Sequence, residues 1–353
     1  MNLDIVDPTQ YPNWDDVLLS TPGHSFFHSS AWARVLKDSY GYTPLYFATI
    51  KNGQFSTLVP VMEVNSFITG KRGVSLPFTD YCDPIINEDV SFHDLFKQII
   101  DFGKSRGWKY VELRGGDRYL RNQNPASVPL APFPSKKYFG HTLDLSQGEK
   151  KIFSNLRDST RRNIKKAQKK GVAVTILNSP DGIEEYYKLN CITRKKHGLP
   201  PQPFHFFKKT FEYIISNQTG FILLASLGDQ YIAGAIFFYL GHTAIFKYGA
   251  SNQRYHHLRA NNSVMWEAIK WCCQNDHKNL SLGRTDLDNQ GLLQFKTGWG
   301  GRQEIINYYK YEISKEAFIN NSFKKKYLEN RLFKNMPIAL LKIAGSILYR
   351  HLG

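Results

Sequence analysis

The chain has 353 residues, of which 42% are hydrophobic and 14% aromatic, and its formal net charge is +16. This content supports packed cores and excludes a disordered chain, and the length favours two domains. No apolar run approaches the roughly 20 residues that a bilayer span requires. The first residues include acids where a signal peptide is basic, so we expect a cytoplasmic protein whose four cysteines are reduced.

The positive charge is concentrated in two segments. Residues 150–170 hold nine basic residues and one acid, and residues 315–353 hold eight basic residues and two acids. These segments therefore carry net charges of +8 and +6, and the rest of the chain is nearly neutral. A focused basic patch attracts phosphates or an anionic membrane surface, although two well-solvated helical faces would give the same pattern.

The first half of the chain has the pattern of an α+β fold. Periodicity predicts helices at 30–37 and 92–105. It predicts strands at 46–50, 55–63, 110–114 and 138–145. Lys51-Asn52-Gly53 lies between the first two strands and is a strong hairpin signal. Four prolines within 122–134 predict a surface loop.

A single basic helix is predicted between Ser146 and Gly171. Ser146-Gln147-Gly148-Glu149 fits a capping box, and Gly171 fits a helix C-cap. Apolar or small residues recur every four positions and predict one buried stripe. The stripe consists of Ile152, Leu156, Thr160 and Ile164. Lysines and arginines occupy the remaining faces of this helix.

The second half repeats the plan of the first. Residues 223–231 parallel residues 47–55, and each predicted hairpin is followed later by a helix and a short strand. Two copies of one α/β unit of about 150 residues are the simplest account of this pattern. We therefore expect domains at 1–145 and 146–314, followed by a basic helical tail at 315–353.

The tail has the pattern of an amphipathic helix. Pro337 suits the first helical position, and an apolar stripe follows it. The stripe is made of Leu340, Leu341, Ala344, Ile347 and Leu348, with Lys334, Lys342 and Arg350 near its edges. Such a helix either lies in a membrane interface or docks on the protein body or on a partner.

The most informative segment for chemistry is 282–301. A predicted strand ends there, and polar residues, glycines, Lys296 and Trp299 follow it. Ligands in α/β folds bind at the ends of strands. Lys296 could pair with a phosphate or stabilise an oxyanion, and the plain alternative is a lysine at the rim of a glycine-rich turn.

These elements together resemble the FemABX family. The resemblance rests on the order of elements, on the run Arg161-Arg162-Asn163-Ile164-Lys165-Lys166-Ala167, and on Gly291, Phe295-Lys296 and Trp299-Gly300. It covers most of residues 25–312. It implies an α/β (α+β) fold of two tandem GNAT-like domains with mixed central sheets. It also implies an acyltransferase that adds amino acids from aminoacyl-tRNA to peptidoglycan precursors, or one related to exopolysaccharide loci.

The resemblance also implies site residues. Lys296 matches a late family lysine near the acyl centre, and Asp286 beside it is a candidate general base. The resemblance assigns substrate contacts to residues of both halves of the chain. These residues are Trp32, Arg34, Tyr81, Arg161, Arg162, Lys165, Tyr248, Arg284 and Trp299. No spacing in the sequence predicts a metal site.

Two departures leave the donor open between aminoacyl-tRNA and acyl-CoA. Residues 252–262 contain no glycine where CoA-dependent enzymes have a glycine-rich phosphate loop, so bulky side chains are expected to crowd it. The long helical arm of FemA-type enzymes is also missing. A CoA-dependent N-acetyltransferase and a non-catalytic, membrane-associated binder of glycan precursors remain alternatives. Expected partners are a phosphate-bearing envelope precursor, tRNA, and the inner face of the cell membrane through the tail.

Overall fold

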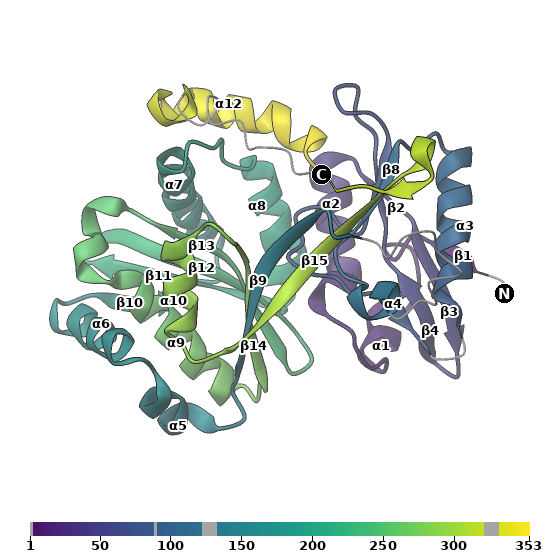
Figure 1. Cartoon of the computed structure of the whole chain (residues 1–353). Helices are drawn as coiled ribbons and strands as arrows, with labels where there is room; N and C mark the ends of the chain where they lie inside the picture. The colour runs from purple at the N-terminus through teal and green to yellow at the C-terminus, as the bar shows by residue number, and fades with distance from the viewer. Residues whose placement is uncertain (1–2, 88–89, 122–132, 321–331) are drawn as a thin grey trace. The chain divides into compact units, whose positions relative to one another are not determined.

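The computed structural model describes residues 3–87, 90–121, 133–320 and 332–353. The chain forms two compact units that are discontinuous in sequence (Figure 1). The first unit holds the described parts of Met1–Tyr138, Ile305–Lys324 and Tyr349–Gly353, and the second holds those of Phe139–Glu304 and Lys325–Leu348. The predicted boundaries at 145 and 314 assumed continuous domains, whereas β15 (Arg302–Glu312) runs from the second unit into the first.

The first unit contains two sheets. One has the order β1-β3-β4-β7, and the other includes β15-β8-β6-β5-β2. The strands are β1 (Asp4–Val6), β2 (Thr43–Pro44), β3 (Tyr46–Lys51), β4 (Gln54–Val59), β5 (Met62–Val64), β6 (Arg72–Val74), β7 (Ile85–Ile86), β8 (Tyr110–Leu113) and β16 (Ala317–Phe318). The helices are α1 (Trp14–Leu19), α2 (Ser30–Tyr40), α3 (Phe92–Ser105) and α4 (Asp117–Arg121), with short turns η1 (Phe26–His28), η4 (Ile313–Lys315) and η5 (Tyr349–His351).

The second unit is a mixed sheet covered by helices. Its strand order is β10-β11-β12-β13-β14-β9. The strands are β9 (Lys136–Asp144, within this unit from Phe139), β10 (Ala173–Ile176), β11 (Gly220–Leu227), β12 (Gln230–Leu240), β13 (Thr243–Ser251) and β14 (Asn279–Asp286). The helical segments are α5 (Gly148–Asn155), α6 (Asp158–Lys169), α7 (Pro180–Lys196), α8 (Phe204–Thr210), η2 (Phe211–Ile215), η3 (Gln253–Leu258), α9 (Ala260–Gln274), α10 (Gln290–Thr297) and α12 (Ile338–Leu348).

The α/β class and the predicted hairpins are confirmed. In the first unit Lys51 pairs with Gln54 around Asn52 and Gly53, both of which have positive φ, as a tight two-residue turn requires. In the second unit Leu227 pairs with Gln230 around Gly228-Asp229. The proline-rich stretch at 122–132 lies outside the described residues.

The single helix predicted between Ser146 and Gly171 is wrong, because the chain is extended at Leu156 and Arg157 and separates α5 from α6. The Arg157 N–H donates to the Gly298 carbonyl at 3.2 Å instead of continuing a helix. Asp158 then begins α6, where a carboxylate is favourable. The capping box is also absent, since the Ser146 hydroxyl donates to Asp144 at 2.6 Å. The predicted stripe is nevertheless buried throughout.

The core of the second unit explains the order of its layers. Alternate strand residues such as Phe221 and Leu223 pack with Val264 and Ala268 of α9 in one cluster. Helix α7 contacts β12 and β13 from the opposite face, where the side chains of Tyr186 and Leu224 lie close to Gly234 (Figure 1). This arrangement leaves the start of α9 at one end of the sheet, next to the end of β13.

The described residues of the predicted helical tail at 315–353 form strand β16, helix α12 and the turn η5, so the tail is not helical throughout. Helix α12 contacts α7. Leu341 is fully buried, and Gly345 lies so close to the Pro201 carbonyl that a side chain could not fit. Within the described residues, no helix combines the length and the apolar character needed to cross a membrane.

Candidate functional site

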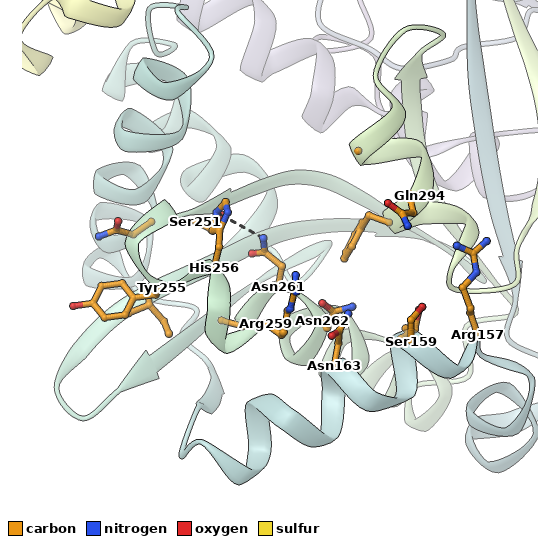
Figure 2. Close-up of a pocket in the computed structure, with 16 residues that line it drawn as sticks. Arg157, Ser159, Asn163, Ser251, Tyr255, His256, Arg259, Asn261, Asn262 and Gln294 are labelled. Atoms are coloured by element: carbon orange, nitrogen blue, oxygen red, sulfur yellow. Dashed lines mark hydrogen bonds between the residues drawn. The ribbon is translucent and has the colours of Figure 1, made fainter.

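A cavity of about 490 Å³ lies within the second unit. It is enclosed by α6, by the end of β13 with η3, by the start of α9 and by α10. Its lining residues are Arg157, Ser159, Thr160, Asn163, Ile232, Ser251, Asn252, Tyr255, His256, Arg259, Ala260, Asn261, Asn262, Gly291, Gln294 and Phe295. Figure 2 shows Ser159 and Asn163 of α6 facing the first residues of α9. None of the predicted site residues lines this cavity.

Strand geometry leads the chain into this cavity. β13 pairs with β14 in parallel only through Thr243–Ile245, although both strands continue beyond these residues. A bulge in β13 places Lys247 between the partners of Ile236 and Phe237. Bulges bend a strand and increase its twist. β13 stays paired with β12 up to Ser251, and Ser251 lines the cavity, so the end of this strand forms part of the cavity.

The first turn of α9 is open toward the cavity. Arg259 precedes it in a left-handed conformation, with φ of 62°, and no side chain caps the helix start. The first N–H groups of a helix lack the usual partners one turn earlier and carry partial positive charge, and in α9 the Asn262 N–H donates to the Arg259 carbonyl at 2.9 Å. Asn261 points its amide toward Ser251, with Nδ2 donating to Oγ at 3.3 Å (Figure 2). This end of α9 is therefore suited to an anion.

The electrostatics of the cavity favour the same ligand class. Arg157 and Arg259 line it, and no aspartate or glutamate is among its lining residues. Burial lowers the pKa of His256, and the charges of Lys196 and Arg259 lower it further. Both causes favour the neutral form of His256, and the two neighbouring positive charges would also attract a phosphate.

The glycine-free loop at 252–262 does not fill the cavity. The Tyr255 hydroxyl contacts Gln230 Oε1 at 2.5 Å, and His256 Nε2 lies 3.0 Å from Ser251 Oγ. These bonds hold both side chains against neighbouring residues of the protein. The bulky residues that were expected to crowd the loop therefore form a wall of the cavity.

The predicted basic residues of α6 fall into two groups, one bound to other groups of the protein and one exposed. The Arg161 guanidinium is held by neighbouring groups of the protein, because it donates to the Ser154 carbonyl at 2.7 Å and pairs with Asp158. Arg162 and Lys165 are exposed, together with Lys166 and Lys169. We call these four residues the α6 basic face. The face lies on the same helix as the cavity residues Ser159 and Asn163.

Lys296 is buried, with 2% of its surface exposed. Its Nζ donates to the Gly283 and Arg284 carbonyls of β14, each at 2.9 Å. These bonds tie α10 to the end of β14. The predicted contact of Lys296 with the reacting acyl group stays a prediction, and the structure shows a tether.

The other predicted residues of the second unit surround this tether or lie in the sheet. Arg284 and Asp286 are half-buried at the end of β14. Trp299 is buried against Phe295, and its indole N–H has no hydrogen-bond partner among the described residues. Tyr248 of β13 packs edge-on against aromatic side chains of α8, with ring centroids about 6 Å apart.

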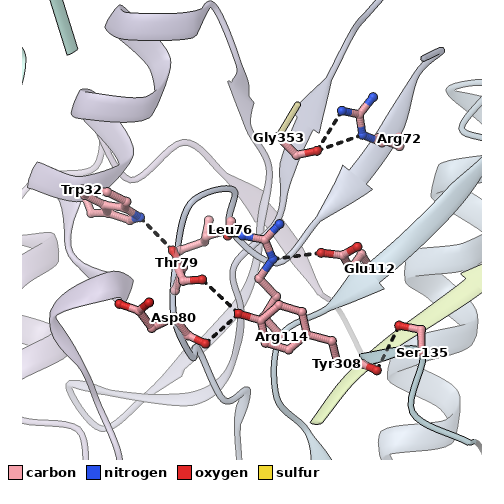
Figure 3. Close-up of polar contacts among 10 residues, drawn as sticks. All are labelled: Trp32, Arg72, Leu76, Thr79, Asp80, Glu112, Arg114, Ser135, Tyr308 and Gly353. Atoms are coloured by element: carbon pink, nitrogen blue, oxygen red, sulfur yellow. Dashed lines mark hydrogen bonds and ion pairs between the residues drawn. The ribbon is translucent and has the colours of Figure 1, made fainter. Parts of the chain in front are cut away.

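Three predicted residues belong to the first unit. Trp32 is fully buried in α2, and its Nε1 donates to Thr79 Oγ1 at 3.0 Å. Tyr308 holds the same loop, since its hydroxyl lies 2.7 Å from the Asp80 carbonyl (Figure 3). Arg34 donates to the Thr9 carbonyl at 3.3 Å, and Tyr81 is 37% exposed. Trp32 thus positions the loop before Tyr81 from inside the core.

Sequence reasoning missed the residues that form the cavity. The signal was present, because a polar run rich in asparagine, histidine and arginine precedes the helix at 260–274. His141 of β9 was also missed. It is buried, and burial and the charge of Lys296 lower its pKa. Within the part of the chain that the structure describes, its Nδ1 has no hydrogen-bond partner.

Comparisons with known proteins agree with this geometry. Residues 154–297 match the acetyltransferase (GNAT) domain family, and every cavity residue lies within that stretch. No protein of curated function matches the chain by sequence.

Solved structures extend the likeness to most of the chain. FemX is similar, with 13% identity, 89% of this chain and 98% of FemX covered, and a TM-score of 0.64. The C-terminal domain of a putative lysylphosphatidylglycerol synthetase from Agrobacterium fabrum has 13% identity, 94% coverage of both chains and a TM-score of 0.56. A tandem GNAT protein from the clavulanic acid biosynthesis pathway has 7% identity, 80% and 87% coverage, and a TM-score of 0.52. At these identities the likeness shows the fold.

Proposed function

We propose that the donor substrate of this chain is aminoacyl-tRNA. The premise is that the chain is an acyltransferase of the GNAT fold with a FemAB-like architecture. The acceptor in this proposal is an amine on a cell-envelope precursor. One observation carries the proposal: the anion-suited cavity at the start of α9 adjoins the helix that bears the α6 basic face.

The choice of donor follows from the distribution of charge. The cavity, with its arginines and open helix end, suits one phosphate-bearing end of a donor. Arg162, Lys165, Lys166 and Lys169 remain exposed outside it and would be unused by a small donor. A polyanion whose end enters the cavity and whose backbone follows α6 uses both features.

The reaction is acyl transfer. The acceptor nitrogen attacks the ester carbonyl of the donor, a C–N bond forms, and the C–O bond to the ribose breaks. The proton lost by the nitrogen ends on the released ribose hydroxyl. Holding the two substrates in line supplies much of the rate in such reactions. In this proposal Asp286 accepts the amine proton and passes it to the leaving ribose oxygen, and the Lys296 tether keeps the end of β14 in place for this transfer.

Acyl-CoA is the second candidate donor. It is favoured by the match of residues 154–297 to acetyltransferases and by the helix end, which suits a pyrophosphate. This candidate does not require the α6 basic face.

The acceptor is proposed from the fold. The likeness to FemX and to a putative lysylphosphatidylglycerol synthetase domain supports an acceptor from the cell envelope.

A donor screen with purified protein tests the proposal. Transfer of label to an amine-bearing peptidoglycan precursor is measured with aminoacyl-tRNA and with acetyl-CoA. Arg259→Asn changes the cavity while suiting the left-handed backbone. Arg162→Gln with Lys165→Gln changes only the α6 basic face. Lys51→Gln with Lys97→Gln, on exposed sites of the first unit, is the matched control for lost charge.

We expect product from aminoacyl-tRNA. The basic-face variant should raise the KM for tRNA about tenfold and flatten its salt dependence. The Arg259 variant should weaken the binding of every donor, and the control variant should leave the binding of every donor unchanged. Product from acetyl-CoA alone would replace the tRNA proposal by the second candidate. Product from neither donor would contradict both.

A further inference from the structure

Helix α12 has a second apolar face besides the one that contacts α7. Leu340, Ile343 and Ile347 are 51%, 57% and 55% exposed. Their spacing places them on one side of the helix, opposite Leu341 and Gly345, which are buried. We call these three residues the outer ridge. Isolated exposed aliphatic residues are common, whereas contiguous exposed apolar patches mark interaction sites.

A small basic cavity lies beside the start of the same helix. Its volume is about 330 Å³, and it is lined by Ile192, Lys195, Lys196, Gln253, Lys334 and Ile338. Three lysines therefore meet at one cavity, and no aspartate or glutamate is among its lining residues. Residues 332–348 also contain no acid. The cavity is separate from the 490 Å³ site, with which it shares no lining residue.

The field of these lysines reaches their neighbours. Burial lowers the pKa of His197, and the charges of Lys196, Arg194 and Lys334 lower it further. Lys196 also contributes to the lowered pKa of His256. Among the described residues no carboxylate lines this cavity, so the repulsion between its lysines costs free energy in the unbound protein, and a bound anion removes this cost.

We propose that this surface docks on an anionic phospholipid membrane. The outer ridge enters the boundary between headgroups and acyl chains, and Lys195, Lys196 and Lys334 bind lipid phosphates. Helix α12 lies along the surface, since no described helix can span it. Aliphatic side chains beside lysines match a lipid interface better than RNA, which offers phosphates but no apolar layer. The inference is independent of the proposed donor and acceptor.

Vesicle sedimentation of the full chain tests the proposal. Vesicles of phosphatidylcholine alone are compared with vesicles that contain 30% phosphatidylglycerol. The charge variant is Lys195→Gln/Lys196→Gln/Lys334→Gln, and the ridge variant is Ile343→Gln/Ile347→Gln, which retains helix-forming residues. Matched controls are Lys51→Gln/Lys97→Gln/Lys137→Gln and Leu19→Gln/Ile68→Gln, all at exposed sites of the first unit. Circular dichroism melting confirms that each variant is folded.

The chain should bind the anionic vesicles and be released from them by salt. The charge variant should bind on the order of 100-fold more weakly, and the ridge variant at least about tenfold more weakly. The controls should bind like the unaltered chain. Equal binding by all variants, or no binding to anionic vesicles, would overturn the proposal. Loss of tRNA binding by the charge variant with unchanged vesicle binding would assign the lysines to RNA and would equally overturn it.

Discussion

The two units contain the same hairpin down to its irregularity. In β3–β4 the register shifts between Thr49 and Ile50, and in β11–β12 it shifts between Ala225 and Ser226. These positions coincide when residues 47–55 are aligned with residues 223–231. In each unit a helix and a strand in a parallel pair follow later, α3 with β8 and α9 with β14. The weak repeat in the sequence therefore corresponds to a shared structural plan.

The units differ at the start of the corresponding helices. Ser91 caps α3 by accepting from the Asp94 N–H at 3.3 Å, and Asp94 adds a negative charge to the first turn. The start of α9 has neither a side-chain cap nor an acid, and it opens into the 490 Å³ cavity. A closed helix end stabilises the fold, whereas an open one leaves N–H groups for a ligand. One plan thus gives a capped helix start in the first unit and an uncapped helix start beside a cavity in the second.

The largest effect on stability is expected when the buried cation of the first unit is removed. Arg114 follows β8 and donates to the Leu76 carbonyl at 2.9 Å and to Glu112 at 2.9 Å (Figure 3). Burial raises the pKa of Glu112, but Arg114 and nearby lysines hold it below its ordinary value. Arg114→Ala leaves that carboxylate uncompensated and should lower the free energy of unfolding by about 4 kcal/mol. Urea denaturation measures the change, and a loss below about 1 kcal/mol would contradict this role.

The next effect is a pH dependence that arises in the first unit. Burial lowers the pKa of His28 from 6.5 to about 4. The unfolded chain therefore takes up a proton that the folded chain excludes, and stability is lost as pH falls from about 6.5 to 4. The expected loss from this group is about 3 kcal/mol over that window. His28→Gln should flatten the pH dependence of urea unfolding by that amount. An unchanged slope would show that His28 is not its source.

The next largest effect on stability is expected when Lys296, the buried cation of the second unit, is removed. Lys296→Ala removes a buried ammonium from two β14 carbonyls and should lower the free energy of unfolding by about 2 kcal/mol. Donor affinity should change little, because Lys296 does not line the cavity. Unchanged stability with loss of turnover would instead support the predicted role at the acyl centre.

The smallest effect is expected from a substitution that makes the two helix starts alike. Asn261→Asp introduces into α9 the kind of charge that Asp94 gives α3. The carboxylate should repel the donor phosphates and raise KM about tenfold, while it stabilises the helix by about 0.5 kcal/mol. Asp94→Asn is the matched control and should cost about 0.5 kcal/mol without affecting KM. An unaltered KM in the Asn261 variant would argue against a phosphate at this helix end.

The sequence was sufficient for features that depend on local patterning. Alternation and the Asn52-Gly53 signal located the hairpins, and four-residue spacing located the buried stripe from Ile152 to Ile164. It failed where a distant group decided the outcome. The helix breaks at Leu156 because the Gly298 carbonyl accepts from Arg157, which periodicity cannot reveal. Lys296 was assigned to the site by its position in a motif, but its two carbonyl partners become visible only in three dimensions.

Hydrogen exchange of the two helix starts tests the central claim most directly. Exchange is measured by mass spectrometry with and without deacylated tRNA, and separately with CoA. We expect slower exchange in peptides covering 252–262 when deacylated tRNA is bound, and unchanged exchange in peptides covering 91–97 of the first unit. Equal behaviour of the two segments with both ligands would contradict an open, phosphate-binding end at α9.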